Sequence, residues 1–227
     1  MSLQIYSMDD LRRFPVEGYV LPEVALKKCR EADHRQLTGA EFALFRAVHN
    51  QRNSPAWRMY PHTDTLVGYG IFRGKPTLLI RHGNHKLSTS EGIEELRANG
   101  YVRNKFKLEN GLWTQYCEDG LEQIGGKRQT WIIQGKALER LVSDNVSVDK
   151  ATATTALVPM LGDLAIAPGY SEGHINNVGD NIYVFVDKYA TNSDQALGCP
   201  LVFVVSGNLY GSNNVVSGCV VGVSSSA

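Results

Sequence analysis

The stretch that decides the fold is VGDNIYVFVD, residues 178–187, which lies in a part of the chain that carries almost no charge. Residues 151–227 hold one base, Lys188, and five acids. Because the whole chain has 23 bases and 23 acids, residues 1–150 carry the other 22 bases and 18 acids. This change in charge density predicts a charged α+β portion over 1–150 and a neutral β-rich portion over 151–227, as two domains or as one continuous domain.

Short apolar runs in the neutral portion predict strands. The runs are residues 156–161, 164–167, 182–186, 201–205 and 215–223, separated by Gly, Asn, Ser and Pro. Strands at this spacing indicate a small sandwich, a barrel, or an extension of a sheet formed earlier in the chain. Several runs are apolar at successive positions, so both faces of these strands are expected to be covered.

The first quarter of the chain predicts helices. Residues 7–15 start with a serine followed by acids, a pattern that favours a short helix. Residues 22–32 begin with a proline, which suits the first turn of a helix. Residues 38–52 open with Thr38 and Glu41, the spacing of a capping box. The N-terminal region is therefore expected to be helical.

The middle of the chain predicts a mixture of helices and hairpins. The expected strands are 66–72, 77–80 and 130–133, and the expected helices are 88–99 and 136–142. Residues 101–108 and 112–117 flank Asn110 and Gly111, a pair typical of tight turns between antiparallel strands. These two segments are therefore expected to form a hairpin.

The overall charge narrows the classes of partner. The formal net charge is zero and the isoelectric point is about 7.0, so no long-range field attracts a polyanion. General nucleic-acid binding and membrane binding are not expected. The N-terminus shows no pattern of an export signal, so the expected location is the cytoplasm of a host cell or a virion.

The cysteines and histidines predict no metal site and no cofactor. Four cysteines lie far apart in the sequence, without a metal-binding or redox pair, and are expected to be buried thiols. His82 and His85 are three residues apart, and His62 could join them in space. A zinc site would need a further ligand that this pattern does not supply.

Arg81, His82 and Gly83 follow an apolar strand and resemble the signature of the histidine phosphatase family. The resemblance implies that His82 is phosphorylated and that Arg81 binds phosphate. It also implies a second histidine, for which His174 is the candidate, and a second arginine, whose nearest equivalent is Lys150. A hydrolase that uses His82 is thus the alternative to a protein without enzymatic activity.

A second hydrolase hypothesis rests on the chain order of His82 or His85, Asp163 and Cys199. This order is similar to that of viral chymotrypsin-like cysteine proteases. The resemblance implies that the histidine takes the thiol proton and that the aspartate orients the histidine. That family places its nucleophile between glycines, and the corresponding position here is occupied by Leu197. This difference favours a structural role for Cys199.

Residues 178–184 together with 217–224 resemble the small β-domains of tailed-phage virion proteins, such as head-decoration and capsid-associated subunits. The resemblance implies a non-enzymatic building block that packs against copies of itself and against other virion proteins. A neutral β surface is inexpensive to desolvate, which agrees with this role. The expected function is therefore a structural or assembly protein that forms homo-oligomers.

The neutral strands supply the residues expected at such an interface. The sequence interpretation places there Ile182, Val184, Val186, Leu201, Phe203, Val205, Val216 and Val221.

Overall fold

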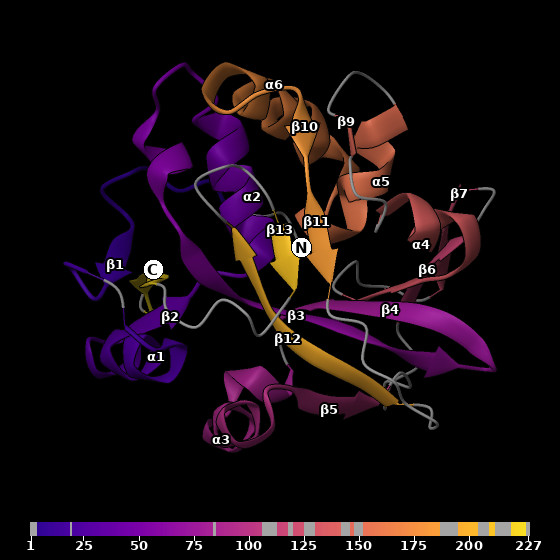
Figure 1. Cartoon of the computed structure of the whole chain (residues 1–227). Helices are drawn as coiled ribbons and strands as arrows, with labels where there is room; N and C mark the ends of the chain where they lie inside the picture. Colours follow the sequence, from indigo (N-terminus) through magenta and orange to yellow (C-terminus); the bar gives the residue numbers. More distant parts are fainter. Residues whose placement is uncertain are drawn as a thin grey trace.

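The computed structural model describes residues 4–18, 20–83, 85–105, 113–117, 120–124, 130–141, 146–147, 152–186, 195–203, 209–211 and 219–225 (Figure 1). Its helices are α1 Pro22–Glu31, α2 Gly39–Val48, α3 Ser90–Asn99, α4 Gly135–Leu141, α5 Thr152–Leu161 and α6 Ala167–Asn177, with short 3-10 turns η1 Pro55–Arg58, η2 Lys86–Ser88 and η3 Leu164–Ile166. The architecture is α+β.

The strands belong mostly to one large mixed sheet. They are β1 Arg12–Phe14, β2 His34–Gln36, β3 Pro61–Phe72, β4 Lys75–His82, β5 Val102–Lys105, β6 Trp113–Cys117, β7 Gly120–Ile124, β8 Thr130–Ile133, β9 Val146–Ser147, β10 Asn181–Ile182, β11 Val184–Val186, β12 Gln195–Phe203, β13 Leu209–Gly211 and β14 Cys219–Ser224. The main path runs β11-β13-β12-β3-β4-β8-β6-β7. β9 and β10 form a separate pair.

β3 and β4 form a hairpin that agrees with the two strands predicted over residues 66–72 and 77–80, and the strand order places this hairpin at the centre of the sheet. The two strands pair from Phe72↔Lys75 to Thr65↔His82. The connection uses Arg73 and Gly74, both with positive φ, which suits the twist of a tight hairpin.

Alternate residues of the central strands enter different cores. Leu78 and Ile80 of β4 belong to the largest apolar cluster, whereas Leu79 belongs to a second one. This is the period of two that a strand imposes on its side chains. Both faces of the sheet are therefore covered.

The helices α2, α5 and α6 cover one face of the sheet (Figure 1). Phe42 and Phe45 of α2 and Tyr170 of α6 are buried there. Phe42 also meets Phe203 of β12, with ring centroids 5.1 Å apart in an edge-on arrangement. The neutral C-terminal strands are thus buried by helices of their own chain.

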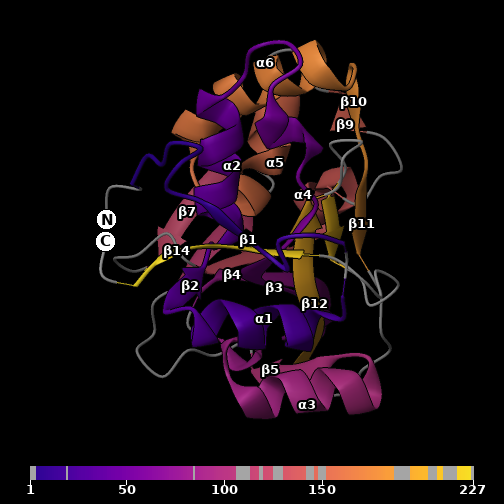
Figure 2. The same ribbon diagram turned by 90° about the vertical axis from the view of Figure 1, so that its left-hand side faces the viewer.

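The other face carries α3, and α1 lies beside it over β14 (Figure 2). Leu66 and Leu79 of the sheet pack in one cluster with Leu87 of η2. Phe14 and Val220 pack in another cluster with Leu26 of α1. β1, near the start of the chain, pairs antiparallel with β14, near its end. The ends of the described chain are thus joined in one sheet.

Local helix signals are confirmed in detail. The capping box of α2 is present, with the Glu41 N–H donating to the Thr38 side chain and the Thr38 N–H donating to the Glu41 carboxylate. The α3 helix is capped by Thr89 and ends at Gly100, whose φ is 77°. Such left-handed C-caps favour glycine.

Two predicted strands are wrong. Residues 156–161 belong to helix α5, and residues 164–167 form η3 and the start of α6. Leu157, Val158, Met160 and Leu161 are all buried. A helix that is buried on every side shows a continuous apolar run, so periodicity could not separate it from a buried strand.

The hairpin predicted across Asn110 and Gly111 is also wrong. β5 pairs with β12, and β6 pairs with β7 and β8. The residues of the expected turn, 106–112, lie outside the described residues. The apolar alternation marks the strands correctly, but it does not identify their partners, which come from distant parts of the chain.

The short helix expected over residues 7–15 is replaced by a turn and strand β1. Asp10 Oδ2 accepts hydrogen bonds from both the N–H and the hydroxyl of Ser7, each at 2.7 Å. Such local bonds between side chain and backbone compete with helix formation.

The C-terminal strands extend the earlier sheet, one of the three arrangements that the sequence left open. β12 and β14 both pair with β3, so strands from both sides of residue 150 lie in one sheet. Among the described residues, no helix is long and apolar enough to cross a membrane.

Candidate functional site

His82 lies in the interior and is held at both ring nitrogens. Its Nδ1 lies 2.8 Å from the Thr65 hydroxyl, on the neighbouring strand β3. Its Nε2 lies 2.9 Å from the Pro159 carbonyl of α5. The Thr65 hydroxyl also accepts a hydrogen bond from the Gly39 N–H at the start of α2, at 2.8 Å. The ring therefore ties together four elements of the fold.

These partners define the state of the His82 ring. A carbonyl can only accept, so Nε2 carries the proton and Nδ1 accepts from the Thr65 hydroxyl. Burial lowers the pKa of His82 to about 4. A neutral ring with both nitrogens engaged has no lone pair available to attack a phosphorus atom or to take a proton from a thiol.

The other residues of the phosphatase hypothesis face elsewhere. Arg81 follows the alternation of β4 to the face opposite His82. Nδ1 of His174 donates to the Gly179 carbonyl at 2.6 Å, and its ring packs edge-on against Trp57. His82 lies against α5 and His174 lies near the end of α6, so the described residues of the predicted phosphate site do not come together. Lys150 lies outside the described residues.

The residues of the protease hypothesis are likewise held in structural contacts. The Cys199 thiol is buried and donates to the Gly100 carbonyl, with Sγ 3.4 Å from the oxygen. Asp163 accepts from the Ala165 N–H, at 3.0 Å, in the turn after α5. His82 is oriented by Thr65 rather than by an aspartate. Each group has a structural partner.

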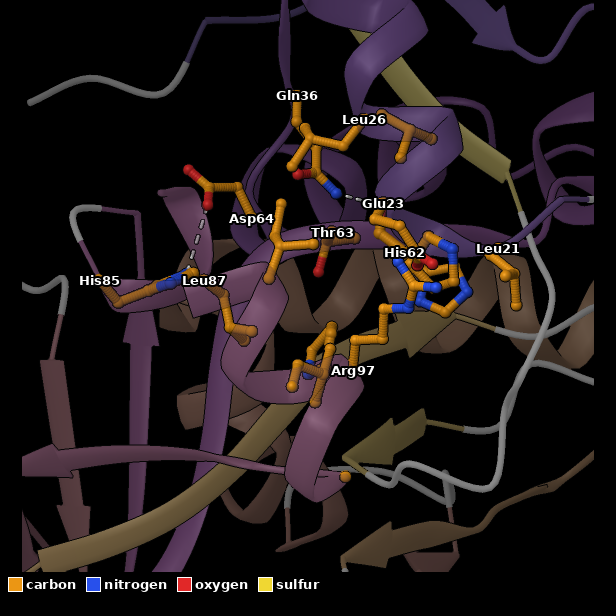
Figure 3. Close-up of a pocket in the computed structure, with 16 residues that line it drawn as sticks. Leu21, Glu23, Leu26, Gln36, His62, Thr63, Asp64, His85, Leu87 and Arg97 are labelled. Carbon is orange, nitrogen blue, oxygen red and sulfur yellow. Dashed lines mark hydrogen bonds and ion pairs between the residues drawn. The ribbon is translucent and has the colours of Figure 1, made fainter. Parts of the chain in front are cut away.

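His85 lies away from His82, in a pocket of about 280 Å³ between α1, α3 and the sheet (Figure 3). Its Nε2 lies 3.3 Å from Asp64 Oδ1, and the Ser88 hydroxyl donates to the same oxygen at 2.7 Å. Burial lowers the pKa of His85, although the Asp64 carboxylate acts in the opposite direction. At this end of the pocket His85 Nε2 therefore contacts Asp64, whereas His85 Nδ1 has no hydrogen-bond partner among the described residues.

His62 lines the same pocket as His85, whereas His82, the third histidine of the group considered in the sequence, lies against α5. Its side chain is 3% exposed, and neither ring nitrogen has a hydrogen-bond partner among the described residues. In Figure 3 His62 lies toward Glu23 of α1 and Leu21, the residue before that helix, and away from the Asp64–His85 pair. Burial lowers the pKa of His62 to about 4.

The histidines do not form a metal centre. Within the residues described above, no three His, Cys, Asp or Glu side chains gather in a way that could hold a metal ion.

The residues expected at an interface lie mostly in the core. Ile182, Val184, Leu201, Phe203 and Val221 are all buried within the single chain, and Val186 is half-buried. Within the chain these residues pack against α2, α5 and α6. Val205 and Val216 lie outside the described residues.

The neighbours of those buried residues form an exposed aromatic row. Tyr183 and Phe185 are 38% and 43% exposed. Phe185 stacks on Tyr183 with centroids 6.2 Å apart and on Tyr210 of β13 with centroids 4.6 Å apart. The sequence interpretation placed Ile182, Val184 and Val186 at an interface, whereas the outward-facing residues of this segment are Tyr183 and Phe185.

Comparisons with known proteins bear on the fold. No family model matches the sequence, and no curated protein sequence matches it. A solved structure, described as "Accommodation of massive sequence variation in Nanoarchaeota by the C-type lectin fold", is similar to this chain with a TM-score of 0.66. It is 18% identical in sequence, and the match covers 94% of this chain and 97% of the other. The large mixed sheet with flanking helices is thus C-type lectin-like.

Proposed function

We propose that the protein is a non-enzymatic assembly protein that associates with copies of itself through the aromatic row Tyr183, Phe185 and Tyr210. One observation carries the proposal: three stacked rings line the outward side of β11 and β13, and two of them are more than a third exposed. Exposed aromatic side chains that are held rigid are typical of binding surfaces.

The position of β11 supports self-association. β11 ends the strand order of the sheet, and its sequence Val-Phe-Val has none of the lysines or prolines that usually protect an edge strand. Residues 151–227 carry only six charges, so bringing two copies together desolvates few of them. These features favour association with a second copy of the chain.

The structural placement of the catalytic candidates favours a role without catalysis. His82 is engaged at both nitrogens, and the Cys199 thiol is buried against a carbonyl. Activity screens on phosphoesters and peptides, run with the intact protein and with His82→Asn, test this point. Turnover that the variant abolishes would support a hydrolase instead.

The same face could serve a second function, recognition of a different macromolecule. The solved structure with the similar fold is described as accommodating massive sequence variation. A fold that tolerates sequence variation can carry different surface residues, and such surfaces are suited to binding different partner molecules. Light scattering separates the two functions, because only self-association raises the mass of the purified chain. A place for these copies in a virion, as the phage resemblance implies, stays a prediction.

A further inference from the structure

The pocket between α1, α3 and the sheet contains a polar group that the fold leaves unsatisfied. His62 is 97% buried, yet both of its ring nitrogens lack a hydrogen-bond partner among the described residues. Buried polar atoms in native proteins nearly always have partners, because an unpaired one keeps the cost of losing water. The exception at His62 therefore needs a physical reason.

The surroundings of His62 show that its position is built. Its backbone carbonyl accepts a hydrogen bond from Gln36 Nε2 at 2.8 Å. Asp64, two residues further along β3 and on the same side of the strand, has its Oδ1 in contact with His85 Nε2 and with the Ser88 hydroxyl. The pocket thus has internal polar contacts at the Asp64 end, whereas the His62 ring at the other end has none among the described residues.

The size and lining of the pocket define what could fill it. Its walls are mostly apolar and include Leu21, Leu26, Leu87, Ile93, Leu96 and Val220. Its volume is about 280 Å³, whereas an apolar cavity of about 150 Å³ holds one benzene ring. The space suits a compact molecule of about two fused rings.

The charges around the pocket favour an uncharged occupant. The ionisable groups at its walls are Glu23, His62, Asp64, His85 and Arg97. Arg97 is exposed to solvent, and Asp64 Oδ1 already contacts His85 and accepts a hydrogen bond from Ser88 within the chain. His62 is neutral near pH 7, because burial lowers its pKa to about 4, and a neutral ring offers one donor and one acceptor. Apolar walls disfavour a charged ligand.

We propose that this pocket binds a small, uncharged, bicyclic heteroaromatic compound, which packs between α1 and α3 and exchanges a hydrogen bond with the His62 ring. The pocket lies between α1, α3 and the sheet, and it shares no residue with the aromatic row on β11 and β13. Its failure in experiment would therefore leave the proposed self-association unaffected.

The test uses two probes of the same shape, benzimidazole and indene, titrated into the full chain at about pH 8 and followed by calorimetry and ligand-observed NMR. Benzimidazole has a donor and an acceptor nitrogen, and indene has neither. We expect benzimidazole to bind at least about fivefold more tightly than indene. This ratio of affinities corresponds to the net free energy of one hydrogen bond.

Two variants and one control decide the outcome. His62→Phe keeps an aromatic ring and removes the ring nitrogens. It should therefore lower the affinity for benzimidazole about fivefold and leave the affinity for indene unchanged. Leu96→Trp fills the pocket and should abolish binding of both probes. Ile175→Lys, at an exposed position on α6, should change neither. Equal binding of the two probes, full affinity in His62→Phe, or no binding of either probe at millimolar concentration would each overturn the proposal.

Discussion

The Thr65 hydroxyl lies 2.8 Å from His82 Nδ1 and joins the β3–β4 pair to the helices on one face of the sheet. The same hydroxyl accepts the Gly39 N–H of α2, and His82 Nε2 donates to Pro159 of α5. A histidine that the sequence presented as a catalytic candidate is thus a structural link between β3, β4, α2 and α5.

Removal of the Thr65 hydroxyl should therefore destabilise the fold strongly. Thr65→Val keeps the shape and leaves the Gly39 N–H and His82 Nδ1 buried without partners, which we expect to lower the free energy of unfolding by roughly 2–4 kcal/mol. Thr63→Val is the matched control, because the Thr63 hydroxyl makes a single bond to Leu201 O. Urea denaturation measures both, and equal losses would contradict this role of Thr65.

Acid should destabilise the protein through its buried histidines. Burial lowers the pKa of His62 and of His82 to about 4, while an unfolded histidine titrates near 6.5. Between these values the unfolded chain binds protons that the folded chain does not, so stability is lost as pH falls from about 6.5 to about 4. The upper limit is roughly 3 kcal/mol per histidine.

His62→Phe tests both this pH dependence of stability and the cost of the unpaired ring nitrogens of His62. At neutral pH the variant should be more stable by about 1 kcal/mol, because two unpaired buried nitrogens are gone. Its loss of stability between pH 6.5 and 4 should also be smaller than that of the unmodified protein. Thermal unfolding followed by circular dichroism at several pH values gives both quantities. An unchanged pH profile would show that His62 is not a buried neutral histidine.

The cysteines should behave as structural thiols. Burial raises the pKa of Cys29 to about 11 and also raises that of Cys219. Cys199 is completely buried. These three of the four cysteines should resist iodoacetamide in the native protein and react after unfolding, since the thiolate is the reactive form. Peptide mapping by mass spectrometry reads each site, and rapid native labelling of Cys199 would revive the protease hypothesis.

The parts of the fold that could be predicted from sequence are the local ones. Thr38 and Glu41 identify the start of α2 because the capping box lies within one turn of a helix. The residues 156–161 were misassigned because a fully buried helix and a buried strand share an apolar run. The partner of β5 is β12, some ninety residues later, and no local signal carries that information.

The candidate sites depend more than the helix ends do on contacts between residues that are far apart in the sequence. The pocket around His62 takes residues from β2, β3, α1 and α3, so its existence follows only from the tertiary structure. The exposed row was within reach of sequence reasoning, because Tyr183 and Phe185 alternate with buried Val184. The strict period of two in residues 182–186 was the signal that could have assigned these aromatic side chains to the outward face.

The most direct test of the proposed self-association is the mass of the protein in solution, measured by light scattering at on the order of 50 micromolar, a concentration at which weak interfaces of standard size are populated. We expect a mass above the 25.0 kDa of one chain. Phe185→Lys should return it to a single chain, while Ile175→Lys, equally exposed on α6, should not. A mass of 25.0 kDa for the unmodified protein, or an oligomer that Phe185→Lys leaves intact, would contradict association through the aromatic row.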